Sequence, residues 1–248
     1  MTATTSEQVL YLYGLVQHGA AISADLIGVG REPVRTVSAG DVDAVVSDLS
    51  PADQVATAAA VRAHAGVLDA VAAEAPVLPV RFGTTASDVE NLVAELADED
   101  EADYADQLRR LRDLVQLSVR ARYVRDQIMA ELLEEEPEIA QLRDATRDQP
   151  EDAMYYDRIR LGELVVAGFE RKRAADAPAI EEVVAAHATE LRHRPESEVE
   201  TVLDVAVLVP RSRVTRFEDA LDAVAEQASG RIVFRLVGPQ PPYDFVEP

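Results

Sequence analysis

The spacing of apolar residues changes several times along this chain, and this change limits the possible folds more than any other feature of the sequence. Val9–Val16 and Val202–Val209 are short, mostly apolar runs that predict buried β-strands. Val115–Tyr123 alternates apolar and polar residues, which predicts a strand buried on one face. The longer stretches between these strands carry apolar residues three and four positions apart, as amphipathic helices do. Together these patterns predict an α+β fold.

The first part of the chain predicts a small sheet covered by helices. Val34–Ser38 and Val42–Ser47 are separated by a short turn sequence and predict a β-hairpin. Val77–Phe82 predicts a further strand. Because Pro79 cannot donate a backbone hydrogen bond, that strand is expected at a sheet edge or with a bulge. A helix is predicted to begin at Ser50, since Ser is a favourable N-cap residue.

The second part of the chain predicts another sheet. Its elements follow in the order strand, helices, strand, helix and strand, which is similar in outline to a ferredoxin-like fold that lacks one strand. We therefore expect a modified ferredoxin-like sheet with helices on one face. Its later elements are predicted as two helices at Leu161–Phe169 and Ile180–Leu191, the strand Val202–Val209, a helix opened by a capping box at Thr215–Glu218, and a last strand at Arg231–Val237.

Four consecutive carboxylates, Asp98–Glu101, separate the two parts. Such a run repels itself and prefers water, so it predicts a linker. We therefore expect two domains and a tail. The predicted segments are an N-terminal α+β domain of residues 1–100, a C-terminal domain of residues 101–237 with a helical insertion, and a C-terminal tail of residues 238–248.

The charge of the chain limits its partners. With 46 acidic and 24 basic residues, the formal net charge is −22. This charge opposes phosphate backbones and anionic membrane surfaces, so we expect neither nucleic acid nor a membrane as partner. Met1–Gln8 lacks the basic and apolar regions of a secretory signal, which favours a cytoplasmic protein. The basic cluster Arg171–Arg173 is interpreted as lying near the C-terminal end of a helix, where it complements the helix dipole, and structural salt bridges are favoured for it.

The residues needed for common catalytic or metal sites are missing or wrongly spaced. The chain has no Cys, which excludes thiolate metal ligands and cysteine nucleophiles. Gly28–Gly30 is interpreted as a turn and not as a nucleotide-binding loop, because Pro33 blocks the helix that should follow. We expect no enzyme activity, no catalytic residue, no metal and no cofactor. The histidines, which lack the spacing of a zinc helix, are His18, His64, His187 and His193.

The C-terminal segment Gly238–Phe245 combines three prolines with two aromatic residues. Pro241 and Pro242 restrict the backbone and so reduce the entropy lost on docking. Tyr243 and Phe245 follow as aromatic anchors. The segment can pack against its own domain or bind a partner. Because aromatic side chains are usually covered, packing against its own domain is favoured.

Several segments, taken together, resemble the gas vesicle protein F/L family. The tail, Gly-Pro-Gln-Pro-Pro-Tyr-Asp-Phe, resembles the terminal signature of that family, with Gln240 in place of the usual Trp. Val77–Thr84 resembles the family's Pro-Val-Arg-Phe-Gly-Thr stretch. Tyr11–Gly14 and Leu161–Val165 also lie where the family has similar residues. The resemblance covers nearly the whole chain in the same order.

The resemblance implies a non-enzymatic accessory protein that acts in the formation of gas vesicles, in the cytoplasm and at the vesicle. It implies contacts with the hydrophobic gas vesicle shell protein and with other gas vesicle accessory proteins. It also implies a two-domain fold with a modified ferredoxin-like C-terminal domain. The residues that we expect to bind a partner or to join the domains lie in the two motifs: Arg81, Phe82, Gly83, Pro241, Pro242, Tyr243 and Phe245.

A small-molecule-sensing regulatory module is the alternative function, because ferredoxin-like sheets often hold small ligands. Such a module needs a concave pocket in which several polar groups converge. The sequence shows no such set of residues, so the structural and assembly function is favoured.

Overall fold

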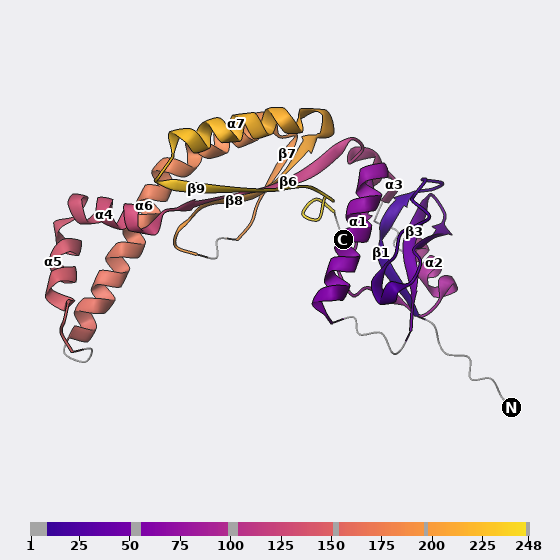
Figure 1. Ribbon diagram of the computed structural model, residues 1–248, viewed down its shortest axis with the longest axis horizontal. Helices are drawn as coiled ribbons and strands as arrows, with labels where there is room; N and C mark the ends of the chain where they lie inside the picture. Colours follow the sequence, from indigo (N-terminus) through magenta and orange to yellow (C-terminus); the bar gives the residue numbers. More distant parts are fainter. Residues whose placement is uncertain (1–8, 51–55, 99–103, 151–153, 196–197, 247–248) are drawn as a thin grey trace. The chain divides into compact units, whose positions relative to one another are not determined.

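The computed structural model describes residues 9–50, 56–98, 104–150, 154–195 and 198–246 (Figure 1). The described part of the chain mixes helices with strands and contains two antiparallel sheets. It divides into two compact units. The N-terminal unit holds residues 1–116 together with 239–248, and the C-terminal unit holds residues 117–238.

The sheet of the N-terminal unit is built around its first strand, β1. This strand is buried from Leu10 to Val16, as its apolar run predicted. The predicted hairpin is confirmed, because Ala39 pairs with Val42 and leaves a two-residue turn. The strands lie in the order β2-β3-β1-β4, and a short fifth strand also pairs with β1. Their bounds are β1 (Val9–Gln17), β2 (Arg35–Ala39), β3 (Val42–Leu49), β4 (Val77–Pro79) and β5 (Thr85–Ala86).

The strand predicted at Val77–Phe82 is shorter than expected. It ends at Pro79, on the edge of the sheet, which confirms the edge position that proline required. The chain then leaves the ladder for five residues and returns to β1 as β5, where Thr85 pairs with Tyr11. Both short strands therefore lie along the same neighbour, and the loop between them is held close to β1.

Helices of the N-terminal unit are α1 (Ala58–Glu74), α2 (Val89–Asp98) and α3 (Tyr104–Arg110). The predicted start of the first helix at Ser50 is wrong. The helix begins at Ala58, because the Thr57 hydroxyl accepts a hydrogen bond from the Ala60 amide at 3.1 Å and so caps it. Residues 51–55, which follow the predicted start, and most of the acidic linker predicted at Asp98–Glu101 lie outside the described residues.

The sheet of the C-terminal unit has the order β7-β8-β6-β9. The alternation predicted for its first strand is confirmed: Leu117 and Val119 are buried, whereas Arg120 lies on the other face and donates to Asp204 at 2.7 Å. A strand that the sequence analysis missed, β7, pairs with β8 and supplies the fourth strand. The bounds are β6 (Leu114–Tyr123), β7 (Glu190–His193), β8 (Thr201–Pro210) and β9 (Ile232–Gln240).

Four helices accompany this sheet, and two predictions about them are wrong. The two helices expected at Leu161–Phe169 and Ile180–Leu191 are one helix of 33 residues that continues through Pro178. The capping box at Thr215–Glu218 is not used, because the helix begins one residue earlier, at Val214. The bounds are α4 (Arg125–Glu135), α5 (Pro137–Thr146), α6 (Tyr155–His187) and α7 (Val214–Gln227).

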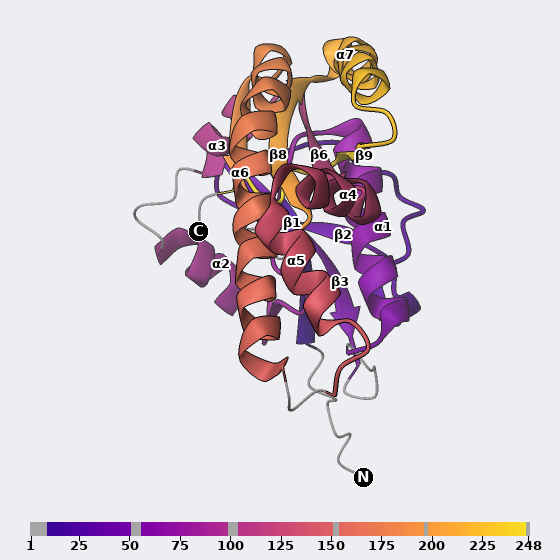
Figure 2. The same ribbon diagram turned by 90° about the vertical axis from the view of Figure 1, so that its left-hand side faces the viewer.

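The helices α6 and α7 add buried side chains to the core that the sheet begins. Ile180 and Val184 of α6 and Phe217 and Leu221 of α7 join Leu117 in one hydrophobic cluster. The first half of α6 extends beyond these contacts, and α4 and α5 pack beside it (Figure 2). This half of the helix therefore depends on the α4–α5 pair for its burial.

The basic cluster Arg171–Arg173 is used inside the C-terminal unit. Lys172 forms salt bridges with Glu131 at 2.8 Å and with Glu135 at 2.7 Å, and Arg171 pairs with Glu136. These contacts join α6 to α4 and to the residue that caps α5. The cluster lies inside α6 and not near its end, so the expected complement to a helix dipole is wrong. The interpretation of the cluster as forming structural salt bridges is confirmed.

Candidate functional site: the Arg81–Gly83 loop and the C-terminal tail

Two motifs singled out by the sequence, the loop after β4 and the tail after β9, both lie in the N-terminal unit. The loop is a tight turn, in which the Thr84 amide donates to the Arg81 carbonyl at 3.2 Å and the Thr84 hydroxyl donates to it at 2.7 Å. Gly83 has φ +90°, a conformation that glycine adopts with little strain. Arg81 is exposed, whereas Phe82 is partly covered.

A cluster of rings lies under this turn. The ring centroid of Phe82 is 5.5 Å from that of His64 and 6.3 Å from that of Tyr11. The hydroxyl of Tyr11 lies 3.0 Å from Nδ1 of His64 and accepts a hydrogen bond from the Gly83 amide at 3.1 Å. Tyr13 stacks on the imidazole, at 5.5 Å between centroids, and its ring centroid is 4.9 Å from that of Tyr11. The ring cluster therefore fixes the turn that carries Arg81, and it does so through both packing and hydrogen bonds.

His64 is the functional neighbour that sequence reasoning missed. Val61 is an apolar residue of α1, but its side chain is exposed, whereas the polar His64 is buried and faces the sheet. The sequence signal for its burial was spacing. His64 lies four residues before the buried Leu68, so the two side chains share one face of α1. Burial lowers the pKa of His64, although its hydrogen bond to the Val80 backbone acts in the opposite direction.

Acid conditions are expected to destabilise the N-terminal unit through His64. In the unfolded chain the imidazole of His64 binds a proton below about pH 6.5. In the folded unit, burial lowers the pKa of His64, so the imidazole binds a proton only at a lower pH. The free energy of unfolding therefore includes the full contribution of neutral His64 above about pH 6.5. This contribution is lost as the pH falls, by at most about 1.4 kcal/mol per pH unit. Urea unfolding at about pH 7.5 and pH 5.5 should show a larger loss for the unmodified chain than for His64→Gln. Equal losses would contradict a buried neutral imidazole.

The tail turns back onto the N-terminal unit after β9. The last strand continues to Gln240, beyond its predicted end at Val237. Pro241 and Pro242 are buried, and the Phe245 amide donates to the Pro242 carbonyl at 3.0 Å, which closes a turn. The ring of Phe245 is fully buried, and its carbonyl accepts from Nη2 of Arg110 at 2.9 Å. The tail is thus packed against its own chain.

Gln116 holds the tail from the other side. Its amide nitrogen donates to the Asp244 carboxylate at 2.6 Å, and its side-chain oxygen accepts from the Asp244 amide at 2.9 Å. The period-two pattern predicted that Gln116 would be a polar residue on the open face of its strand. It is fully buried instead, because the tail covers it. A polar residue with both its donor and its acceptor used is well placed to fix the position of a tail.

Tyr243 is the aromatic residue of the tail that stays at the surface. Its side chain is 42% exposed, in contrast to that of Phe245. Partial burial and the negative charge of Asp69 raise the pKa of Tyr243 to about 12, so the phenol is neutral at physiological pH. The tail contacts Arg110 and Gln116, and the loop contacts the ring cluster; each motif thus has its own support within one unit.

Other features bear on enzyme and ligand functions. Gly28–Gly30 lies in the turn that was predicted there and lines a cavity of about 540 Å³ in the N-terminal unit. Thr57 contributes a polar side chain to that lining, but its hydroxyl already accepts a hydrogen bond from the Ala60 amide as the cap of α1. Within the described ranges, no group of three or more His, Cys, Asp or Glu residues could hold a metal ion. No helix in that part of the chain is long and apolar enough to cross a membrane.

Two solved structures share this fold. The crystal structure of the gas vesicle protein GvpF from Anabaena matches with a TM-score of 0.80 at 18% identity, covering 97% of this chain and 98% of that chain. That of GvpF from Microcystis aeruginosa matches with a TM-score of 0.79 at 21% identity, covering 96% and 98%. At these identities the likeness shows the fold alone. This chain has the fold of these two GvpF structures.

Sequence comparison identifies the family. The family described as gas vesicle synthesis protein GvpL/GvpF matches residues 9–247. Gas vesicle protein F of a Streptomyces species is 34% identical over 240 residues, which cover 96% of this chain and 99% of that protein. Gas vesicle protein F2 of Halobacterium salinarum is 29% identical over 187 residues, covering 73% and 85%. The chain belongs to the GvpL/GvpF family, which confirms the resemblance found in its motifs. This is a family of gas vesicle accessory proteins and not a known enzyme family.

Proposed function

We propose that this chain acts in gas vesicle formation by binding the hydrophobic shell protein and other gas vesicle accessory proteins, in the cytoplasm and at the vesicle. The observation that carries the proposal is Tyr243. It stays 42% exposed although its neighbours Pro242 and Phe245 are buried. A rigid backbone that presents an aromatic side chain loses little entropy on binding. The exposed Arg81, on the turn that the ring cluster holds, offers a second contact.

The charge of the chain supports the same function. An apolar shell subunit associates readily with its own copies, and a partner with a net charge of −22 can keep such a subunit dispersed. Binding through a few fixed side chains allows later release to a growing shell. The residues proposed to contact a partner, or to position the surface that does, are Arg81, Phe82, Gly83, Pro241, Pro242, Tyr243 and Phe245.

We also propose the two-domain organisation expected from the sequence, with a modified ferredoxin-like C-terminal domain. The order β7-β8-β6-β9, with α6 entering before β7 and α7 before β9, supports this fold, because it is the strand order of a βαββαβ unit. The two compact units also support two domains. The proposed divisions are residues 1–100, residues 101–237 and a tail of residues 238–248. The compact units have different boundaries, because residues 101–116 and 239–248 group with the N-terminal unit.

The proposed function is tested by a double substitution at the surface. Arg81→Ala with Tyr243→Ala removes two exposed side chains, so the melting temperature should change little. Co-purification of shell protein from vesicle-forming cells should fall at least about five-fold, since exposed Tyr and Arg often dominate an interface. Val61→Ala, at another exposed position of the N-terminal unit, is the control and should bind normally. Unchanged co-purification by the double variant would refute the proposed contact.

A further inference from the structure

The sheet of the C-terminal unit ends in two very different edge strands. β7 is only four residues long, and two of its side chains, Glu190 and Arg192, form a salt bridge at 3.1 Å. Short length and charge keep an edge strand from pairing with another chain. β9, yellow in Figure 1, has nine residues and carries no further strand on its outer side within the described part of the chain. It therefore presents a row of outward N–H and C=O groups to which a further strand can bond.

Apolar side chains are incompletely covered on both faces of β9. Phe234 and Leu236 are partly buried against the core that α6 and α7 share with the sheet. Because side chains alternate along a strand, Val233 and Val237 lie on the opposite face, where they are 60% and 42% exposed. A helix docked on one face would cover only one of these pairs. A strand added beside β9 continues both faces of the sheet and so covers both pairs.

Arg235 supplies a charge at the same edge. It lies between the two exposed valines, on the same face of β9. Its side chain is exposed and forms no ion pair with another residue of the described ranges. A carboxylate on a neighbouring strand would gain a charge-assisted hydrogen bond from this guanidinium group. The edge therefore favours a strand that places an acidic residue beside Arg235.

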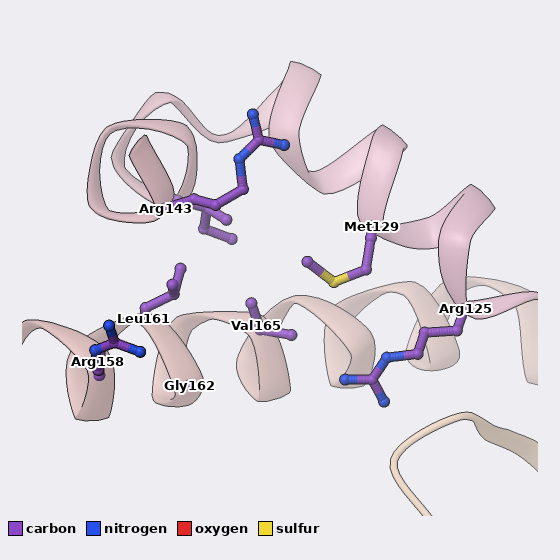
Figure 3. A pocket seen from close by; sticks show the side chains of 8 residues that line it. Arg125, Met129, Arg143, Arg158, Leu161, Gly162 and Val165 are labelled. Carbon is purple, nitrogen blue, oxygen red and sulfur yellow. The ribbon is translucent and has the colours of Figure 1, made fainter. Parts of the chain in front are cut away.

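Another apolar surface of the same unit gives no such indication. It is a cavity of about 250 Å³ between α4, α5 and α6, into which Val165 points (Figure 3). Two arginines around it, Arg125 and Arg143, already pair with Glu200 and Asp144. Their charges therefore do not identify an occupant, whereas the edge of β9 specifies both a backbone conformation and a charge.

A second copy of this chain is a poor occupant of the edge. Antiparallel pairing of two β9 strands that brings Val233 opposite Val237 places the two Arg235 side chains opposite each other. Parallel pairing in register places them side by side. Like charges at such positions destabilise a strand pair, and two copies of charge −22 also repel each other. Arg235 therefore opposes self-pairing and selects a strand of opposite charge.

We propose that β9 binds an extended segment of a partner protein, which joins the sheet as a further strand. The backbone of that segment pairs with residues 233–237, its apolar side chains cover those of β9, and its Asp or Glu pairs with Arg235. The pairing ends before Pro239, which cannot donate a backbone hydrogen bond. The proposal rests on the proposed function only in placing the partner among the proteins of the gas vesicle.

The partner is identified by photo-crosslinking in vesicle-forming cells. A benzoylphenylalanine at Val233 should capture a segment of a different protein in which apolar residues lie two positions before and two positions after an Asp or Glu. The same probe at Ile159, an exposed residue of α6, is the control and should not capture that segment. Capture of this same chain, of a segment without that pattern, or of no protein would overturn the proposal.

Backbone pairing is tested with the captured segment as a synthetic peptide and with the unmodified chain. A strand bonds to its neighbour through the amides of alternate residues. N-methylation of one alternate set of peptide amides should therefore weaken binding at least about ten-fold, because several hydrogen bonds are lost. N-methylation of the other set should change the affinity little. Equal losses with the two sets, or no loss with either, would contradict pairing with β9.

Reversal of charge tests the contact with Arg235. Arg235→Glu should weaken binding of that peptide at least about ten-fold, because like charges then lie side by side. A peptide whose acidic residue is replaced by arginine should restore binding to this variant. Arg216→Glu changes the charge equally at another exposed arginine, on α7, and should bind the original peptide normally. Thermal melting should show that both variants fold.

The outcomes separate this proposal from the proposed function. Unchanged affinity of Arg235→Glu, or a loss that the reversed peptide does not restore, overturns the proposal even if shell protein still co-purifies with the chain. Alternation and restored binding with a segment from outside the gas vesicle would instead support the edge of β9 and contradict the proposed function.

Discussion

Replacing Phe245 by alanine is expected to destabilise the N-terminal unit by about 3–5 kcal/mol, the usual cost of removing a buried aromatic side chain. The ring of Phe245 is fully buried, so its loss leaves a cavity. The effect should spread to the hydrogen bonds beside it, because the Phe245 carbonyl is bound by Arg110 and the neighbouring Asp244 is bound by Gln116. Urea unfolding followed by near-ultraviolet circular dichroism, which reports on the packing of buried aromatic side chains, should measure the loss.

Tyr243→Ala is the matched substitution, two residues earlier in the same turn. Because Tyr243 is 42% exposed, this change should cost less than about 1 kcal/mol. Comparing Phe245→Ala with Tyr243→Ala separates the two roles proposed for the tail, packing against its own chain and binding a partner. If Phe245 anchors the tail and Tyr243 contacts a partner, Phe245→Ala mainly lowers stability and Tyr243→Ala mainly lowers co-purification of shell protein. Equal losses of stability in the two variants would contradict this division of roles.

The strands were mostly predictable because their signal is local. The apolar run of β1 indicates a strand covered on both faces, and the alternation of β6 indicates a strand covered on one face. Both patterns can be recognised from consecutive residues. The missed strand β7 reads Glu-Leu-Arg-His, and its polar residues hide the pattern. It forms because its backbone pairs with the strongly apolar β8. Tertiary pairing of this kind leaves almost no mark in a four-residue sequence.

The errors at helix ends have a different cause. Several Ser, Thr and Asp residues compete as caps near each helix, and local chemistry does not choose among them. Thr57 caps α1, although Ser50 looked equally suitable. In α6, two apolar stripes predicted two helices, but packing against β8 and α7 keeps one helix continuous through Pro178.

The motifs of the candidate site were visible in the sequence, but their supports were not. Pro241, Pro242 and Phe245 are conspicuous because prolines and aromatic residues stand together. Gln116 lies 128 positions from its partner Asp244, and no local pattern joins them. His64 likewise becomes recognisable only in the fold, where α1 packs on the sheet and places the imidazole against Tyr11 and Tyr13. Residues that act by holding other residues are found through the fold.

Replacing Gly28 by alanine should have the second large effect, a loss of at least about 3 kcal/mol in the N-terminal unit. An added Cβ would lie 1.9 Å from the hydroxyl of Tyr13, a distance that no small adjustment relieves. That hydroxyl bonds to Ser47 at 2.8 Å and accepts from the Val29 amide at 2.7 Å. Since Tyr13 is fully buried, its displacement breaks two buried hydrogen bonds and disturbs the stack on His64.

Gly66→Ala provides the control for that substitution. Gly66 lies in α1, where an added Cβ would meet nothing within 4 Å, so alanine should stabilise the unit by about 0.5–1 kcal/mol. Combining Gly28→Ala with Tyr13→Phe removes the atom in closest contact. The combined loss should therefore be smaller than the sum of the two single losses, as measured by urea unfolding. Strict additivity would mean that Gly28 is needed for its own backbone and not for Tyr13. A smaller combined loss would show that this glycine is required by the ring cluster that supports Arg81.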